Sequence, residues 1–390
     1  MRVLFVTHNI PRFAGDAAGS FVLRLAVALQ DQGVTVDVIA PGAPGLDVIS
    51  RIEGVNIHRV RYAAEARMSI AYAGTMAEDV RRSWSARFAL LGLLRATRRA
   101  VREQIATAER AGEPYDIVHA HWWFPSALAL WRAIGTGGPP LVVTMHGSDV
   151  RLAQGIAPAR RLMRAVLTQA RSRTAVSSWL ADAASRIAPG LRIRVEPMPV
   201  DIRHFVPAPQ VPRAGILFVG RLNAQKGLAK LLDALAMPSL RRASLDVVGD
   251  GPDADALRRH ALALGVNDRV RWHGVLPQPD LVPCYQRAEV VAMPSIDEGL
   301  GLVAVEAQLC ETPVVAFASG GLPDVVRMDA GGTLVTAGDT RAFSEAIAQL
   351  LDDETRARTA GRHARVAMLA HFAPSAVATR YLALYREALT

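Results

Sequence analysis

The chain has 390 residues, of which 51% are hydrophobic, and a formal net charge of +9. This length exceeds that of one ordinary domain, and the apolar content suffices for two hydrophobic cores. The positive charges are scattered and no basic run alternates with aromatic residues, which excludes the usual pattern of a nucleic-acid-binding platform. The two cysteines, Cys284 and Cys310, are too few for a disulfide framework and lack metal-ligand spacing, so a cytoplasmic location is expected.

The first half of the chain alternates short apolar segments with segments of helical period. The expected strands are residues 3–7, 34–41, 115–123 and 140–149, with a helix over 21–33 and a strand-to-helix passage over 174–184. Such alternation predicts parallel strands joined by helical crossovers. The first strand follows the initial Met without the pattern of a secretion signal, and no apolar run reaches the ~18 residues of a membrane-spanning helix.

The alternation begins again after a proline-rich segment near 205–213. The strands expected there are residues 216–221, 245–251, 270–276, 290–295 and 313–319. The break predicts a domain boundary, with residues 1–205 in a first domain and 206–374 in a second. The predicted fold class is α/β, with two Rossmann-like, doubly wound parallel-sheet domains that face a cleft, and ligands bind such sheets beyond the carboxyl ends of the strands.

Polar residues and glycines gather at these strand ends. In the first domain they are Thr7, His8, Asn9, His119, His121 and residues 146–149, and in the second they are Gly220, Arg221, Lys226, residues 249–252, His273, Gly274 and residues 295–299. A tight turn is the better explanation for any single glycine, whereas the joint pattern favours a ligand site.

The richest of these segments is residues 294–317. An apolar strand runs into a loop there, and a helix is expected to begin close to Gly299 and Gly301. Glycines permit close approach of the backbone to a ligand, and the free amides of a helix start bind anions. Glu298 precedes this helix and Glu306 lies inside it, so their carboxylates can accept hydrogen bonds from a sugar ring and a ribose. Either glutamate alone is explained as well by an ordinary solvated position.

Four motifs, EGLGLVAVE from Glu298 to Glu306, GRLNAQKG, GDGP and MHGSD, occur in an order and spacing that resemble the retaining GT-B glycosyltransferases of family 4, also described as glycosyl transferases group 1. The resemblance spans nearly the whole chain. It implies transfer of a hexose from a UDP- or GDP-sugar, with retention of anomeric configuration, to a lipid-linked or polysaccharide or other glycan acceptor, as in polysaccharide biosynthesis. It also implies that the last helix, residues 375–390, returns to the first domain, and that no cofactor is needed.

The resemblance further implies roles for individual residues. Arg221 and Lys226 would hold the donor diphosphate, Glu298 the sugar hydroxyls and Glu306 the ribose. His146 would face the sugar from the first domain, so the expected catalytic set is Arg221, Lys226, Glu298 and His146. The other expected donor-site residues are Gly15, Gly19, Asp250, Val275, Gly299, Leu300, Gly301 and Leu302. The family often has Gly-Gly in the first loop, and here either Gly15 or Gly19 could make that contact.

Lys226 is one of only two lysines among 45 Lys plus Arg. Two kinds of cation suit a diphosphate leaving group. Arginine supplies a planar, bidentate guanidinium, and lysine supplies a compact, mobile point charge. Chance placement is the alternative, and Lys230, one helical turn further on, illustrates it.

The expected mechanism is metal-independent. No Asp-x-Asp follows a strand, and Asp253 and Asp255 open a helix, where acidic residues suit the macrodipole. Arg221, Lys226 and the helix start would stabilise the charge that develops on the leaving oxygen. A front-face route is expected, in which the departing phosphate helps to deprotonate the acceptor; a covalent glycosyl-enzyme on Glu298 is the alternative.

Residues 81–102 combine arginines with apolar residues near helical spacing. Such a helix can lie on an anionic bilayer, which would place the protein peripherally on the inner face of the plasma membrane. A core-facing helix with solvated arginines is equally compatible. The expected acceptor pocket is lined by His119, His121, Trp122 and Trp123, because aromatic rings stack on sugars, although core packing explains a tryptophan as well.

Other function classes fit less well. A nicotinamide dehydrogenase needs Gly-x-Gly-x-x-Gly directly after a strand, which is lacking here. A phosphorylase with a lysine-bound cofactor has few lysines to use. A sugar-nucleotide epimerase of the same architecture and a catalytically silent nucleotide-sugar-binding protein stay open as alternatives.

Overall fold

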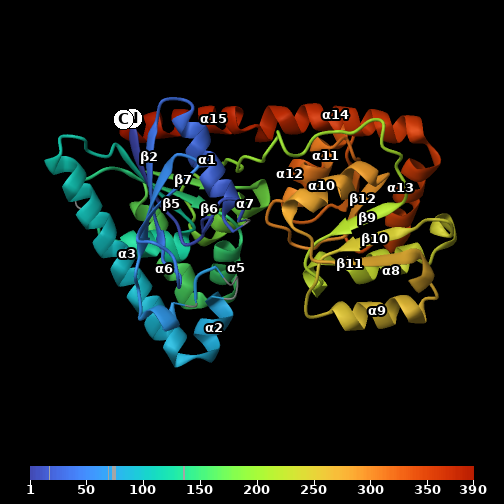
Figure 1. Cartoon of the computed structure of the whole chain (residues 1–390), viewed down its shortest axis with the longest axis horizontal. Helices are drawn as coiled ribbons and strands as arrows, with labels where there is room; N and C mark the ends of the chain where they lie inside the picture. Colours follow the sequence, from blue (N-terminus) through green and yellow to red (C-terminus); the bar gives the residue numbers. More distant parts are fainter. Residues whose placement is uncertain (17, 69, 73–75, 135–136) are drawn as a thin grey trace. The chain divides into compact units, whose positions relative to one another are not determined.

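The computed structural model describes the chain from Met1 to Thr390, except positions 17, 69, 73–75 and 135–136 (Figure 1). It divides into two compact units, which are described separately. Unit 1 comprises Met1–Pro199 and Pro374–Thr390, and unit 2 comprises Val200–Ala373.

Unit 1 contains a sheet in the order β3-β4-β2-β1-β5-β6-β7-β8. Its strands are β1 (Arg2–Val6), β2 (Thr35–Pro41), β3 (Ile49–Ile52), β4 (Val55–Val60), β5 (Ile117–His121), β6 (Leu141–Met145), β7 (Ser172–Ala175) and β8 (Arg194–Val195). Neighbouring strands are parallel, except that β3 and β4 form an antiparallel hairpin. The chain leaves β1 toward β2 and later returns to β5 on the other side, so the switch point of this sheet lies between β1 and β5.

The helices of unit 1 come from both ends of the chain. They are α1 (Ser20–Gln30), α2 (Met76–Arg82), α3 (Trp84–Arg110), α4 (Leu128–Leu130), α5 (Ser148–Gly155), α6 (Ala157–Gln169), α7 (Ser178–Ile187) and α15 (Pro374–Leu389). α15 packs against α1, and the Tyr385 hydroxyl lies 2.7 Å from Nδ1 of His119 on β5. The last helix is therefore part of the first unit's core.

Unit 2 contains a fully parallel sheet in the order β11-β10-β9-β12-β13-β14. Its strands are β9 (Ile216–Val219), β10 (Leu245–Val248), β11 (Val270–Gly274), β12 (Val290–Met293), β13 (Val314–Phe317) and β14 (Thr333–Val335). Its helices are α8 (Leu228–Leu235), α9 (Ala254–Ala263), α10 (Gln278–Arg287), α11 (Leu302–Leu309), α12 (Leu322–Val325), α13 (Thr340–Asp352) and α14 (Glu354–Phe372). The switch point of this sheet lies between β9 and β12.

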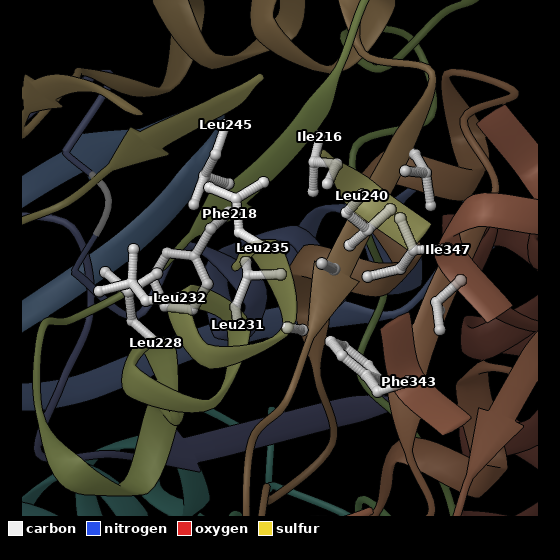
Figure 2. Packing of buried hydrophobic residues seen from close by; sticks show 14 of the residues in the cluster. Ile216, Phe218, Leu228, Leu231, Leu232, Leu235, Leu240, Leu245, Phe343 and Ile347 are labelled. Atoms are coloured by element: carbon white, nitrogen blue, oxygen red, sulfur yellow. The ribbon is translucent and has the colours of Figure 1, made fainter. Parts of the chain in front are cut away.

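One face of the unit 2 sheet packs against α8 and α13 (Figure 2). The apolar side chains of α8 recur at helical spacing, so Leu228, Leu231, Leu232 and Leu235 all turn to the sheet and are buried. Burying each of them contributes about 1.5–3 kcal/mol relative to exposure. This packing fixes β9 and α8, and with them the loop that joins the two.

The structure confirms the predicted α/β fold with two parallel sheets and corrects two details. The units separate after Pro199 and not at residue 205, because the Val200 amide donates to the carbonyl of Phe372 and the buried ring of Phe205 packs on Tyr285. The segment 81–102 is interrupted at Ser83, so that it spans the end of α2 and most of α3. No helix within the described residues is long and apolar enough to cross a bilayer.

Candidate functional site

The loop after β9 holds Lys226 in a short, well-capped turn. The Asn223 side chain accepts a hydrogen bond from the Lys226 amide at 3.1 Å, and the turn ends at Gly227, whose φ is 70°. A Cβ at Gly227 would lie 2.1 Å from the carbonyl oxygen of Pro294, so only glycine fits this close approach. The turn is thereby pressed against the segment that follows β12.

Lys226 and Glu298 meet at the switch point of the unit 2 sheet. The ammonium Nζ of Lys226 lies 2.5 Å from Oε2 of Glu298, and both side chains are mostly buried, at 21% and 14% exposure. Lys226 follows β9 and Glu298 follows β12, and these strands are neighbours in the sheet. The fold thus joins two residues that are 72 positions apart in sequence.

Further hydrogen bonds tie together the loops after β9, β12 and β13. The backbone carbonyl of Gln225 accepts a hydrogen bond from the Ile296 amide at 2.8 Å. The side-chain amide of Gln225 donates to the Asp297 carbonyl at 3.1 Å. The Ser319 hydroxyl accepts from the Asp297 amide at 3.0 Å, and the Glu298 carbonyl accepts from Gly321 at 2.7 Å. The backbone around Glu298 is therefore held in place from both sides.

α11 begins at Leu302, four positions after Glu298 and close to Gly299 and Gly301, as the sequence predicts. Its N-cap is Gly301, with a φ of 95°, and no side chain caps the helix start. This positive φ favours glycine, whereas the nearest atom to a Cβ, Cδ2 of Leu322 at 2.7 Å, is the end of a side chain that can shift. Gly299 and Leu300 complete the loop between Glu298 and this helix start. The amides at the start of α11 can bind an anion.

Glu306 lies on α11 and is held by a tyrosine from α10. The buried Tyr285 hydroxyl donates to Oε2 of Glu306 at 2.8 Å. Burial and the neighbouring Glu306 carboxylate raise the pKa of Tyr285 well above its usual value, so this phenol stays a donor at neutral pH. The Thr312 hydroxyl in turn donates to the Tyr285 carbonyl at 2.6 Å.

The remaining expected residues of unit 2 lie at the same sheet edge. Arg221 is exposed and, among the residues that the structure describes, its guanidinium pairs with no carboxylate. Asp250 is also exposed, and its carboxylate accepts from the amide of Gly251 at 2.7 Å. Val275, which follows β11, is 73% exposed. Because these side chains face solvent, they are free to contact a ligand.

The two glycines expected in the first loop of unit 1 differ in their surroundings. Gly15 is exposed, has a φ of 87°, and a Cβ on it would meet nothing within 4 Å. Gly19 is buried, and its Cβ would lie 2.3 Å from the carbonyl oxygen of Asn9. The packing of Gly19 against Asn9 is therefore sufficient to require glycine, whereas Gly15 leaves open space beside the backbone.

Asp149 organises the loop that carries His146. Its buried carboxylate accepts hydrogen bonds from the backbone amides of His146, Gly147, Val150 and Trp123, at 3.0 to 3.2 Å. The Trp123 indole also donates to the Asp149 carbonyl at 2.7 Å. The single carboxylate thus fixes the segments after β5 and β6 relative to each other.

The histidines of this edge are neutral groups at physiological pH. Burial lowers the pKa of His8 to about 4 and that of His121 to about 3. Burial, together with His121 and His8, lowers the pKa of His146 well below its usual value. Nδ1 of His121 lies 3.2 Å from Nε2 of His146. His146 can therefore give or take a hydrogen bond but carries no charge for a phosphate.

The expected acceptor set is corrected for His119, His121 and Trp123. All three are at most 1% exposed. The ring nitrogens of His119 lie 2.7 Å from the hydroxyls of Tyr385 and Thr144. Both nitrogens are therefore used by hydrogen bonds inside unit 1. Trp122 differs, because it lines a pocket of about 240 Å³. A position at the end of a strand therefore does not by itself show whether a side chain is buried beneath α15, as His119 is, or lines the pocket, as Trp122 does.

Sequence reasoning missed the residues that support the site. Tyr285 lies within α10 and Ser319 follows β13, and neither belongs to a motif. The one signal in the sequence that could have identified them is that each carries a hydroxyl, Tyr285 among the buried positions of a helix and Ser319 in a turn. Their partners become apparent only when the strands are placed side by side.

Comparisons with known proteins assign the family. The description Glycosyltransferase Family 4 matches residues 18–204, and Glycosyl transferases group 1 matches residues 202–366. The D-inositol 3-phosphate glycosyltransferase of Salinispora tropica is 32% identical over 396 residues, covering 90% of this chain and 78% of that protein. The protein of the same name from Thermobispora bispora is 35% identical over 319 residues, covering 70% and 71%.

Solved structures of similar fold extend over the whole chain. Sucrose-phosphate synthase from Thermosynechococcus elongatus has a TM-score of 0.78 at 24% identity, covering 99% of both chains. Anabaena Alr3699/HepE in complex with UDP-glucose has a TM-score of 0.67 at 19% identity, again covering 99% of both chains. The chain therefore belongs to the glycosyltransferases of group 1 and family 4, and it is a hexosyltransferase with the GT-B fold.

Proposed function

We propose that this enzyme transfers a hexosyl group from a UDP- or GDP-sugar to a hydroxyl of a lipid-linked, polysaccharide or other glycan acceptor. The observation that carries the proposal is the contact of 2.5 Å between Lys226 and Glu298, together with the exposed Arg221 on the same loop as Lys226. A cation and a carboxylate held together suit a donor that presents phosphate and sugar hydroxyls side by side. The names of the curated relatives and the structure of HepE with UDP-glucose support this donor class.

The charges of unit 2 suit departure of a nucleoside diphosphate. Breakage of the bond between the anomeric carbon and the diphosphate leaves cationic character on the sugar and negative charge on the leaving oxygen. Arg221 supplies a planar, bidentate clamp, and Lys226 supplies a point charge. The amides at the start of α11 add donors for the same oxygens, so the anion is met by preorganised groups. Glu298 takes the sugar hydroxyls and Glu306 the ribose.

We further propose retention of anomeric configuration by a front-face route without a metal requirement. The departing phosphate takes the acceptor proton while the acceptor oxygen bonds to the anomeric carbon from the same side. Two cationic side chains can supply the charge neutralisation for which other phosphate-transfer sites use Mg²⁺.

The exposed face of α3 supports peripheral contact with an anionic membrane, where a lipid-linked acceptor is found. Trp84, Phe88 and Leu91 lie three or four residues apart and are 72%, 69% and 47% exposed. Core packing therefore does not explain these three side chains. Arg81, three positions before Trp84, and Arg95, four positions after Leu91, are exposed as well. An amphipathic helix with this composition suits an anionic bilayer surface.

Calorimetric titration with UDP and GDP tests the donor site, first without metal and then with Mg²⁺. Micromolar binding of one nucleotide is expected, weakened about tenfold or more in Lys226→Ala and indifferent to Mg²⁺. Lys230→Ala is the matched control, because the second lysine lies one turn further on and contacts Asp233 at 3.7 Å. Binding of neither nucleotide, or equal loss in both variants, would refute the proposed donor site.

A further inference from the structure

The pocket of unit 1 lies at the switch point of its sheet. It has a volume of about 240 Å³. His8 and Asn9 follow β1, Trp122 follows β5, and Ser148 and Asp149 open α5 after β6. This is the place where a doubly wound sheet binds its ligand. All the residues that line the pocket belong to unit 1.

Most of the pocket wall is apolar. The side chains that make it so are Ile70, Tyr72, Met76, Trp122, Phe124 and Leu152. The Trp122 ring lies 4.4 Å from the His8 ring and 4.1 Å from the His146 ring, centroid to centroid, so it is held from two sides. Such a wall favours an apolar group on the ligand, because each buried CH₂ gains about 0.8 kcal/mol.

Two buried polar atoms of the lining residues have no hydrogen-bond partner among the residues that the structure describes. They are Nδ1 of His8 and Oδ1 of Asn9. A buried polar atom without a partner costs about 1–3 kcal/mol, which a ligand hydroxyl would offset. Burial lowers the pKa of His8 to about 4, so its imidazole is neutral and offers hydrogen bonding without charge.

The electrostatics of the pocket disfavour an anion. Its described lining contains no lysine or arginine, and its one acidic residue, Asp149, has a buried carboxylate that already accepts hydrogen bonds from backbone amides. The nearby Arg12 is bound to Asp16 at 2.7 Å, and the buried Arg59 donates to the Pro11 carbonyl at 2.6 Å. Positions 17, 69, 73–75 and 135–136 hold only alanine, serine, glycine and threonine. A phosphate in this pocket would lose its hydration without gaining a cation.

We propose that the acceptor bound here is uncharged, with hydroxyls on the accepting ring and an aryl or alkyl group beside it, and that a phosphorylated polyol is not the preferred acceptor. This inference rests on the proposed function and sets the enzyme apart from relatives named for D-inositol 3-phosphate. In the transfer, the acceptor oxygen bonds to the anomeric carbon, the bond from that carbon to the diphosphate breaks, and the acceptor proton leaves with the nucleoside diphosphate.

The test compares acceptors on the enzyme, with the nucleoside diphosphate found by titration present for binding and the corresponding nucleotide sugar present as donor for transfer. The panel contains methyl, hexyl and p-nitrophenyl glucosides and D-inositol 3-phosphate, with binding measured by calorimetry and transfer by mass spectrometry. The hexyl and aryl glucosides are expected to bind about tenfold more tightly than the methyl glucoside, and inositol phosphate no more tightly than the methyl glucoside. Tightest binding of inositol phosphate, or equal binding of all the glucosides, would overturn the inference.

Two variants separate pocket contacts from general effects. Leu152→Asn is expected to remove most of the preference for hexyl over methyl glucoside, whereas Leu162→Asn, on α6 and outside the pocket lining, is expected to leave it unchanged. Ser148→Arg adds a cation at an exposed lining residue and is expected to improve inositol phosphate binding about tenfold. An unchanged preference in Leu152→Asn contradicts the inference. Failure of UDP and GDP to bind refutes the proposed function instead, independently of the acceptor results.

Discussion

The Lys226 ammonium lies 2.5 Å from Oε2 of Glu298, between the loops that follow the neighbouring strands β9 and β12. The contact is supported on one side by the Asn223 cap and on the other by Gly321, which donates to the Glu298 carbonyl. Under the proposed function, the carboxylate occupies, in the protein without donor, the place at Lys226 that a phosphate oxygen of the donor would take. Donor binding would then replace one anionic partner of Lys226 with another.

Glu298→Gln is expected to uncouple nucleotide binding from transfer. The amide cannot hold Lys226 as an ion pair, so UDP or GDP alone should bind about two- to fivefold more tightly. Transfer should fall by about 100-fold or more, because the contact to the sugar hydroxyls is weakened at the reacting centre. Calorimetry and steady-state turnover measure the two effects. Glu345→Gln, which alters an exposed ion pair with Arg341, should change neither, and weaker nucleotide binding in Glu298→Gln would contradict the exchange of partners.

Tyr285→Phe is expected to weaken recognition of the ribose. The variant removes the hydroxyl that donates to Glu306 at 2.8 Å, which frees that carboxylate to turn away from the ribose. The preference for UDP or GDP over their 2′- and 3′-deoxy forms should fall about three- to tenfold. Tyr381→Phe removes a buried hydroxyl of unit 1 and should cost stability without altering this preference. An undiminished ribose preference in Tyr285→Phe would remove the tyrosine from this role.

Most of the parallel strands and the residues at their carboxyl ends could be predicted from the sequence, because both follow from local patterns. The parallel strands β4, β8 and β14 were not predicted. The supports of Glu298 and Glu306 could not, since Ser319 and Tyr285 acquire their partners only through strand order and helix packing. His119 shows the opposite error. Its strand is buried on both faces, so a polar residue near the strand end lies under α15 and bonds to Tyr385. The β3–β4 hairpin was also not predicted, because its turn is Glu53-Gly54 and lacks the usual Asn-Gly or Asp-Gly signature.

Gly227→Ala is expected to damage both stability and donor binding. Its φ of 70° strains any residue with a Cβ, and that Cβ would lie 2.1 Å from the Pro294 carbonyl oxygen. Gly265→Ala isolates the first effect, because Gly265 has a φ of 69° but open space around its Cβ. The control should lose about 1 kcal/mol, and Gly227→Ala should lose more and bind UDP or GDP more weakly. Equal losses in chemical denaturation would show that the contact with Pro294 has no effect.

Acidification is expected to destabilise unit 1 before the enzyme's carboxylates protonate. The pKa of His8 is lowered to about 4 and that of His121 to about 3, against about 6.5 in an unfolded chain. The unfolded state therefore binds more protons as the pH falls below about 6.5, so the stability present above that pH is lost toward 4, by up to about 1.4 kcal/mol per pH unit for each histidine. Asp149 acts in the opposite direction, because burial raises its pKa.

Tryptophan fluorescence follows this transition in unit 1. Five of the six tryptophans lie in that unit, and Trp272→Phe removes the signal of unit 2. In both the wild type and this variant, the midpoint temperature of thermal unfolding should be lower at pH 5.0 than at pH 7.5. A midpoint that does not move over that range would show that the buried histidines do not control the stability of unit 1.

The α3 surface gives the last prediction, for binding to vesicles. Trp84→Ser with Phe88→Ser should reduce sedimentation with vesicles that contain anionic lipid about tenfold or more, because both side chains are largely exposed and can insert into the interface. Arg95→Ala should also weaken binding. Arg98→Ala should weaken it less, because that guanidinium is already used by the carbonyls of Ala129 and Trp131. Leu262→Ser, at an exposed site of α9, is the control, and equal binding of the double variant and this control would rule out α3 as the membrane contact.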